Sequence, residues 1–152
     1  MLETAIQKLV VDAVNGYGGH AFKAANRFLV GVVDLSVKMP YVAPMDVNPR
    51  HAFLEVKKHD LTVKHWQKSP DEWIKTSITK MQHDFMRDYQ SAGGTVGILS
   101  FLDGRDISEL RMDFIKFIDG VNTYETRARS FQMLGREPIR TQNIIGILRN
   151  NL

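Results

Sequence analysis

Two oppositely charged residues, Glu55 and Lys57, stand on either side of Val56 and directly after the apolar residues 52–54. The segment 52–58 predicts a β-strand, and side chains two residues apart on a strand point to the same face of the sheet. A carboxylate and an ammonium on one face, beside a second carboxylate, can hold Mg²⁺ or Mn²⁺ and assist hydrolysis of a phosphodiester. Charges in a buried strand also require either partners or a function.

The second carboxylate is predicted to be Asp34, at the end of a Val- and Leu-rich run. This run predicts a buried strand over 27–38 with a bend near Gly31. Asp46 competes with Asp34 because it lies only nine residues before Glu55. However, Asp46 belongs to the segment 41–50, which contains two prolines and predicts a solvated loop. Asp34 is therefore preferred, and Asp46 is the alternative.

Other polar residues are candidates for supporting roles around this pair of acids. Lys57 would orient the attacking water or steady charge on the scissile phosphate. Gln82, at the edge of a predicted helix, would bond the metal-bound water or orient Lys57. Glu3 is a candidate third carboxylate, although an acid in the first turn of a helix is also favoured by the helix dipole. His59 and His65 are weaker candidates for contacts with phosphate or metal.

Hydrophobic periodicity predicts a mixed α/β order of elements. Helices are expected over 2–15, 71–91 and 107–118, and strands over 20–25, 27–38, 52–58 and 95–102. The middle helix would begin at a Ser69 cap and bury the stripe Ile74, Ile78, Met81, Phe85 and Tyr89. Residues 144–148 suggest a short helix or strand. The sequence therefore predicts a single domain with helices packed on a small sheet.

Composition excludes several classes of protein. The chain has 152 residues and no cysteine, so disulfides, Cys-ligated zinc and thiol catalysis are excluded. No phosphate-binding loop, dinucleotide-binding pattern or nucleophile elbow is present, so no nucleotide cofactor is expected. No apolar run approaches the roughly 20 residues that span a bilayer, and we expect a cytoplasmic protein.

The net charge is +3, and the basic surplus lies after residue 120. We expect a core over about 2–120 and a basic C-terminal extension over 121–152, which is compatible with phosphate contacts or with an ordinary solvated end. The charged residues of this segment that define the surplus are Arg127, Arg129, Arg136, Arg140 and Arg149, against Glu125 and Glu137.

Four stretches together resemble the VRR-NUC branch of the PD-(D/E)xK nuclease superfamily. They are GVVDL at 31–35, EVK at 55–57, Gln82 within KMQHDFMRDYQ, and the Gly-rich turn into an apolar strand at 92–99. The resemblance covers roughly residues 27–102, and the first helix plausibly belongs to it. Val33 stands where the family usually has proline, and the long interval between the two acids suggests an insertion at 39–51.

The resemblance implies a restriction-endonuclease-like fold and a metal-dependent endonuclease. The metal ligands would be Asp34, Glu55 and the backbone carbonyl of Val56, with Glu3 as a further acid. Stand-alone members of this size are similar to phage or bacterial Holliday-junction resolvases, which act as homodimers in the host cytoplasm. The alternatives are a nuclease for flaps or plain duplex DNA, and a non-catalytic phage structural or assembly protein.

Recognition of DNA by shape would depend on contacts with phosphates. The basic residues expected near the site are Lys23, Arg27, Lys58, Lys75 and Lys80. Each of them is equally compatible with an ordinary solvated side chain.

Overall fold

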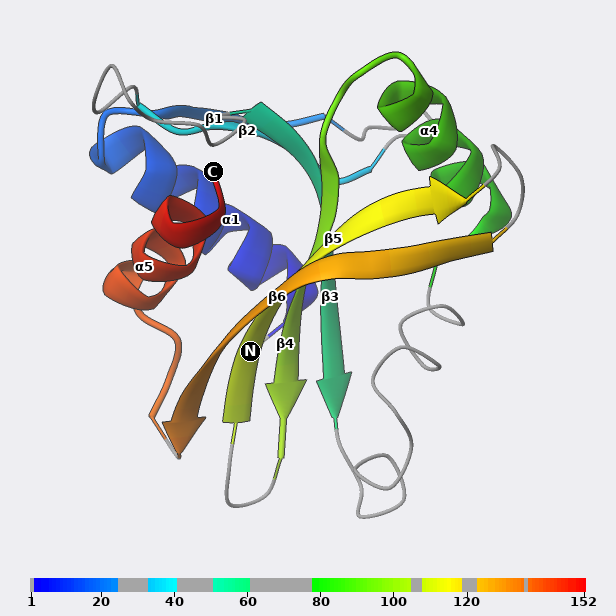
Figure 1. Ribbon diagram of the computed structural model, residues 1–152. Helices are drawn as coiled ribbons and strands as arrows, with labels where there is room; N and C mark the ends of the chain where they lie inside the picture. Colours follow the sequence, from blue (N-terminus) through cyan, green and yellow to red (C-terminus); the bar gives the residue numbers. More distant parts are fainter. Residues whose placement is uncertain are drawn as a thin grey trace.

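The computed structural model describes residues 2–24, 33–40, 51–60, 78–104, 108–118, 123–135 and 137–152, and only the backbone of 115–118 and 123–131. These residues form a mixed α/β fold, as the sequence predicts (Figure 1). In chain order, its elements are α1 Glu3–Gly16, β1 His20–Lys23, β2 Leu35–Lys38, β3 His51–Asp60, α4 Lys80–Ser91, β4 Val96–Asp103, β5 Ser108–Ile118, β6 Thr123–Gly135 and α5 Thr141–Asn151.

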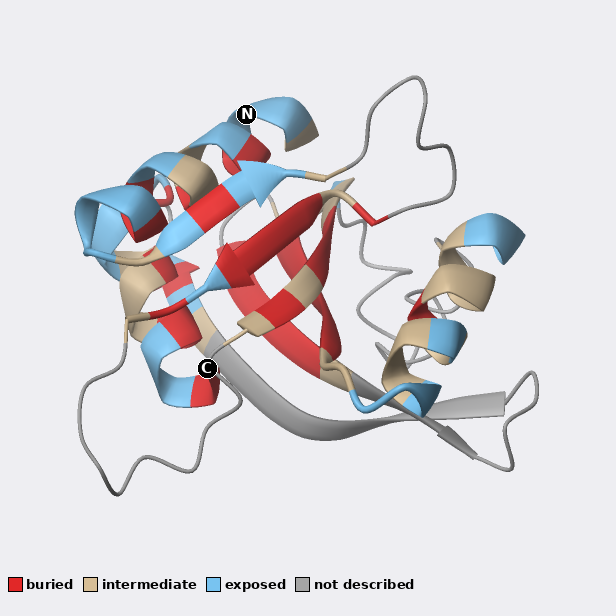
Figure 2. Cartoon of the chain, turned by 90° about the horizontal axis from the view of Figure 1, so that it is seen from above, coloured by how far each residue is buried: buried red, intermediate tan, exposed pale blue. Residues whose placement is uncertain are grey.

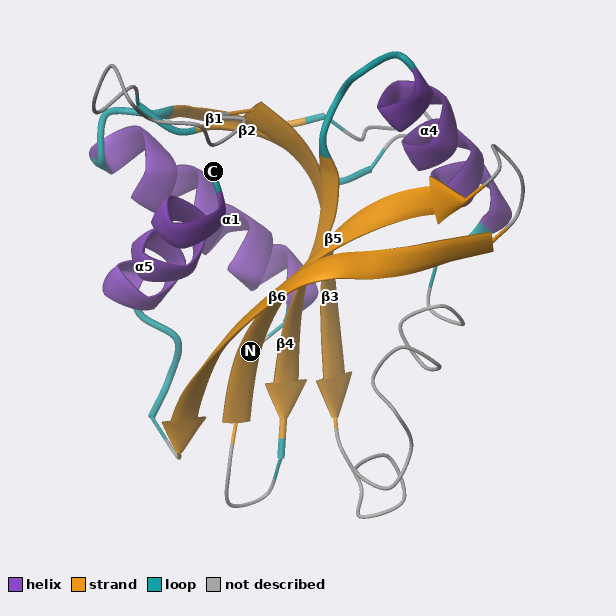
Figure 3. Ribbon diagram, viewed as in Figure 1, coloured by secondary structure: helices purple, strands orange, loops and turns teal. Residues whose placement is uncertain are grey.

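The strands form one sheet in the order β1-β2-β3-β4-β5-β6. Neighbouring strands are antiparallel except β3 and β4, which run parallel. A parallel pair requires a crossover connection, and α4 lies within the connection from β3 to β4 (Figure 3). The crossover brings α4 close to the strand that carries Glu55 and Lys57.

The two faces of the sheet are covered by different helices. α1 and α5 pack against one face, whereas α4 lies on the other (Figure 1). Leu54 and Val56 of β3 belong to the core beneath α1 and α5. Glu55 and Lys57 alternate with them and therefore face the side of α4. The central strands are almost entirely buried, while the helices expose their outer sides (Figure 2).

Aromatic packing fixes α4 over β3. The ring of Phe53 lies edge-on to Phe85 at 5.3 Å and to Tyr89 at 4.7 Å between ring centroids. After α4, Gly93 adopts a φ of 94°, which favours glycine, and the chain turns toward β4. A side chain at Gly94 would collide with the ring of Tyr89. The Gly-rich turn thus permits close contact between α4 and the sheet.

The helix predicted over 107–118 is wrong, because residues 108–118 form strand β5. The apolar residues fit a helical spacing, but Leu110 and Met112 also alternate with charged neighbours. Leu110 and Met112 are fully buried in the core beneath α1 and α5. Pairing with β4 and β6, which lie elsewhere in the sequence, decides between the two patterns.

The helix predicted over 71–91 is only partly confirmed. α4 begins at Lys80, since Thr79 is an extended N-cap residue and Ile78 lies in a bend before it. Residues 71–77 and the proposed Ser69 cap lie outside the described residues. The predicted buried stripe is wrong at Met81, whose exposed fraction is 53%, while Met86 is buried instead.

The predicted boundary of the core near residue 120 is also wrong. β6 pairs with β5 along most of its length, and α5 packs against α1. Leu134, Ile144 and Leu148 belong to the same buried cluster as α1 and β3. The end of β6 and helix α5 therefore complete the domain, because Leu134, Ile144 and Leu148 pack into the core on the α1 side of the sheet.

The remaining predicted elements differ from the structure mainly at their ends. The helix over 2–15 and the strands over 20–25, 52–58 and 95–102 correspond to α1, β1, β3 and β4. Of the strand predicted over 27–38, only 35–38 is β2, and residues 27–32 and 41–50 lie outside the described part of the chain. Among the described helices, none combines the length and apolar character that a bilayer crossing requires.

Candidate active site

Strand β3 presents Glu55 and Lys57 side by side on the face toward α4. The ammonium Nζ of Lys57 lies 3.1 Å from Oε1 of Glu55. The exposed fraction is 1% for the side chain of Glu55 and 15% for that of Lys57. The pair predicted from the strand alternation is therefore present, with its carboxylate buried and its ammonium at the edge of the solvent.

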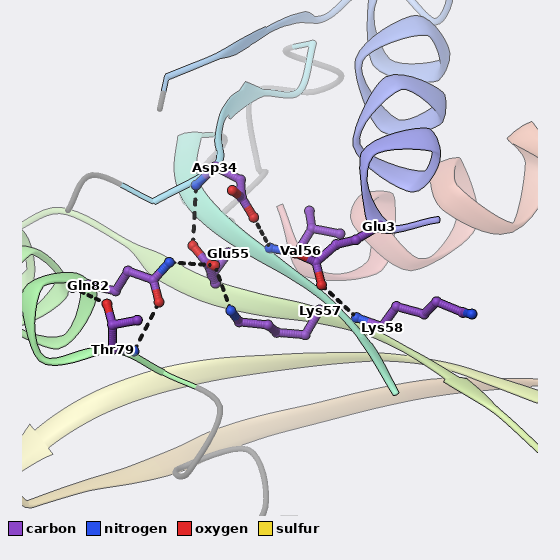
Figure 4. A network of polar contacts seen from close by, with 8 residues as sticks. All are labelled: Glu3, Asp34, Glu55, Val56, Lys57, Lys58, Thr79 and Gln82. Atoms are coloured by element: carbon purple, nitrogen blue, oxygen red, sulfur yellow. Dashed lines mark hydrogen bonds and ion pairs between the residues drawn. The ribbon is translucent and has the colours of Figure 1, made fainter. Parts of the chain in front are cut away.

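Asp34 joins this pair from the bend that precedes β2. Its backbone N–H donates to Oε2 of Glu55 at 3.3 Å, and its Oδ2 accepts from the backbone N–H of Val56 at 2.9 Å (Figure 4). The paired stretch of β2 with β3 ends at Leu35 and Leu54. The side chain of Asp34 thus bonds a β3 backbone group just beyond the ladder, beside the carboxylate of Glu55.

Gln82 connects the first turn of α4 to the same carboxylate. Its Nε2 donates to Oε1 of Glu55 at 2.8 Å. Its Oε1 accepts from the backbone N–H of Thr79 at 3.1 Å, while Thr79 Oγ1 accepts from the backbone N–H of Gln82 at 3.2 Å. This reciprocal capping box fixes the amide so that its donor end faces Glu55.

Burial and the neighbouring acid both disfavour ionisation of Glu55. Burial raises the pKa of Glu55 from its ordinary value of 4.5 to about 7, and the carboxylate of Asp34 adds to this increase. Lys57 acts in the opposite direction without compensating fully. One ammonium group thus faces two carboxyl groups at this site. A divalent cation would supply the further positive charge that keeps both carboxyl groups ionised.

The donor set at this position fits Mg²⁺ or Mn²⁺. Asp34 and Glu55 offer carboxylate oxygens, which hard cations prefer, and Mg²⁺ retains several waters in such sites. The described residues contain no group of three His, Cys, Asp or Glu side chains that would enclose an ion. The protein ligands would therefore be the two acids, with the predicted carbonyl of Val56 and waters completing the shell.

Glu3 is not part of this cluster. It lies at the start of α1, and its Oε2 accepts from the backbone N–H of Lys58 at 3.2 Å (Figure 4). Lys58 follows Lys57 along the strand, so its side chain faces the opposite side of the sheet. The carboxylates of Asp34 and Glu3 accept from backbone N–H groups two residues apart on β3, those of Val56 and Lys58. Among the described residues, Glu3 makes no bond with Asp34 or Glu55, so its role as a third metal ligand stays a prediction.

The predicted DNA contacts are scattered. The ammonium of Lys58 pairs with Asp60 at 3.0 Å and Asp103 at 3.8 Å, on the opposite face from Lys57. Lys23 is exposed on β1 and Lys80 is exposed at the start of α4. His59 shares the face of Lys57 by strand alternation. Predicted candidates that lie outside the described residues are Arg27, Asp46, His65 and Lys75.

Sequence reasoning missed two groups on the same face of the sheet. The guanidinium of Arg111 donates to both carboxylate oxygens of Asp113, at 2.6 and 2.9 Å, and both residues are buried. Ser100 is also fully buried. The alternation of charged and apolar residues in 109–113, and the single serine within the apolar strand VGILSFL, were the available signals.

The fold and the site together describe a mixed α/β domain with a buried carboxylate, a second acid, a lysine and a glutamine at one place. No protein-family model, curated protein or solved structure matches the chain.

Proposed function

We propose that this protein is a Mg²⁺- or Mn²⁺-dependent endonuclease that hydrolyses phosphodiester bonds in DNA. The observation that supports this most strongly is the convergence of two sequence-distant segments, at Asp34 and Gln82, on the carboxylate that Glu55 presents beside Lys57 on β3. The side chains of Lys57 and Gln82 and the backbone N–H of Asp34 bond this carboxylate at 2.8–3.3 Å, while the carboxylate of Asp34 lies beside it and accepts from the backbone N–H of Val56 (Figure 4). A purely structural ion pair would need neither the second acid nor the amide.

Each side chain has a distinct task in this proposal. Asp34 and Glu55 hold the divalent cation, which when bound makes a water more nucleophilic and neutralises charge on the phosphate. Lys57, at the solvent edge, orients the attacking water or donates to an oxygen of the scissile phosphate. Gln82 positions Glu55 by donating to one of its oxygens, and so leaves the carboxylate poised for the cation.

The substrate class follows from the resemblance to the VRR-NUC branch. We propose branched DNA, and a four-way junction in particular, cut by a homodimer that presents one site to each of two strands. Such recognition would rely on phosphate contacts rather than on reading of bases. Lys23 and Lys80 are the described, exposed lysines among the predicted contacts.

The test is a cleavage assay with labelled four-way junctions, flaps and plain duplex, in Mg²⁺ or Mn²⁺ and in chelator. We expect symmetric nicks in the junction that require the metal. Lys57→Ala should abolish cutting and retain junction binding. The matched control is Lys8→Ala, because Lys8 is an exposed residue of α1 that pairs with Asp12, away from the proposed site.

The same cleavage assay distinguishes the alternative functions of the protein. Preference for flaps or duplex by a monomer would change the substrate but keep the nuclease. Absence of cleavage of every substrate, together with absence of metal binding, would favour a structural or assembly protein. Equal cutting by Lys57→Ala and the parent would remove the proposed role of Lys57.

A further inference from the structure

Ser100 is a buried polar residue that the proposed chemistry does not yet use. It lies in the middle of β4 among apolar residues, and its exposed fraction is 0%. Its hydroxyl makes no hydrogen bond with any residue that the structure describes. A buried hydroxyl without a partner is unfavourable and uncommon in folded proteins, so its presence calls for a physical reason.

The strand register places Ser100 directly between two cations. Lys57 of β3 is its partner on one side, and Arg111 of β5 is its partner on the other. Paired residues of neighbouring strands point to the same face, so all three face the side of α4. Arg111 is held by its bidentate interaction with Asp113, whereas Lys57 is held by Glu55.

The bond between Lys57 and Glu55 competes with the proposed metal site. Oε1 of Glu55 already accepts from both Lys57 and Gln82, and Oε2 accepts from the backbone of Asp34. A cation on this carboxylate would take lone pairs and repel the nearby ammonium. Lys57 would then need another acceptor. Neighbouring strands lie about 4.8 Å apart, a span that the long lysine side chain can cross.

We propose that Ser100 positions Lys57 in the metal-bound site. Its hydroxyl accepts a hydrogen bond from the Lys57 ammonium when a divalent cation occupies Asp34 and Glu55. The ammonium then stays beside the reacting phosphate instead of moving into solvent. This inference rests on the proposed metal site, and it makes Ser100 a positioning residue, because a fully buried side chain acts on the substrate only through Lys57.

The test measures affinity for Mg²⁺ and Mn²⁺ by calorimetry on the full chain, without DNA. Ser100→Ala should weaken metal binding about tenfold or more, because one hydrogen bond to a charged group is lost from the bound state. Ser100→Thr keeps the hydroxyl and should restore most of the affinity. Ser100→Ala should fold at least as well as the parent, since it removes an unpartnered polar atom.

One comparison shows whether the effect passes through Lys57, and a second controls for the loss of a serine hydroxyl elsewhere in the fold. In a Lys57→Met background, adding Ser100→Ala should leave metal affinity unchanged. The matched control is Ser36→Ala, because the buried Ser36 hydroxyl bonds His51 Nε2 at 2.9 Å. This control should lower thermal stability but leave metal affinity as in the parent.

Each outcome decides a separate point. Equal metal affinity in the parent and in Ser100→Ala overturns the role of Ser100 and leaves the metal site intact. A loss that persists in the Lys57→Met background overturns it as well, because Ser100 would then act by another route. Failure of the parent to bind either cation overturns both this inference and the proposed function.

Discussion

Gln82 holds Glu55 through a hydrogen bond of 2.8 Å, and the same side chain closes the capping box of α4 with Thr79. The start of a helix and the buried acid of a strand are therefore linked through one amide. A glutamine suits both tasks, because its oxygen serves the helix while its nitrogen serves the carboxylate. The position of α4 over β3 consequently affects the geometry of the proposed site.

Gln82→Met removes both bonds. We expect the free energy of unfolding to fall by about 1–2 kcal/mol, since a capping bond and a bond to a buried charged group are lost. Urea denaturation monitored by circular dichroism measures this change. Gln142→Met is the control, because Gln142 is an exposed residue in the first turn of α5. An equal fall in the free energy of unfolding of Gln82→Met and Gln142→Met would contradict the proposed link between α4 and Glu55.

The raised pKa of Glu55 predicts how stability depends on pH in the metal-free protein. Because the folded state holds this proton more tightly than the unfolded state, the contribution of Glu55 is most favourable at low pH. It is lost as the pH rises from 4.5 to about 7. Glu55→Gln removes this dependence. Relative to the parent, Glu55→Gln should gain about 2–3 kcal/mol between pH 5 and pH 8.

Urea denaturation of the two proteins in chelator, at half-unit steps of pH, measures that difference. Asp12→Asn serves as the control, because Asp12 is an exposed acid on α1. If the free energy of unfolding depended on pH in the same way in the parent and in Glu55→Gln, Glu55 would titrate in the folded protein as it does in the unfolded chain.

Divalent metal should stabilise the folded protein through the two acids. At a Mg²⁺ concentration about tenfold above the dissociation constant, the free energy of unfolding should rise by about 1.4 kcal/mol. Asp34→Asn and Glu55→Gln should each lose most of this increase, whereas Glu3→Gln should keep it. Thermal melts with and without Mg²⁺ provide the measurement. If Mg²⁺ stabilised Asp34→Asn as much as it stabilises the parent, the ion would bind elsewhere.

The buried pair of Arg111 and Asp113 should behave differently from a surface pair. Arg111→Met leaves a buried carboxylate without its guanidinium, and we expect a loss of about 3–5 kcal/mol. The double variant Arg111→Met/Asp113→Leu should recover most of that loss. Lys8→Met, which breaks the exposed pair with Asp12, should change stability by less than about 1 kcal/mol. Chemical denaturation of the three variants tests this contrast.

The sequence alone predicts those parts of the structure that depend on local patterns. Alternation on β3 correctly places Glu55 and Lys57 on one face, and apolar spacing predicts α1. These signals work because a residue's neighbours along the chain set the direction of its side chain. They also predict the two halves of the proposed site, on β3 and α4.

Long-range pairing accounts for most of the errors. Residues 108–118 carry both a helical and an alternating pattern, and contact with β4 and β6 selects the strand. The burial of Ser100 between Lys57 and Arg111 depends on the register of three strands, which no local pattern specifies. The engagement of Glu3 by the backbone of Lys58 likewise depends on how α1 packs against β3.

In our proposal, Asp34 and Glu55 bind one divalent ion beside Lys57. A crystal soaked in Mn²⁺ tests it directly through the anomalous signal of the metal. We predict one strong peak about 2.1 Å from a carboxylate oxygen of each acid. The ammonium of Lys57 should lie on the solvent side of that peak. An ordered Mn²⁺ bound elsewhere, or two acids that still contact only protein atoms at saturating Mn²⁺, would contradict the account.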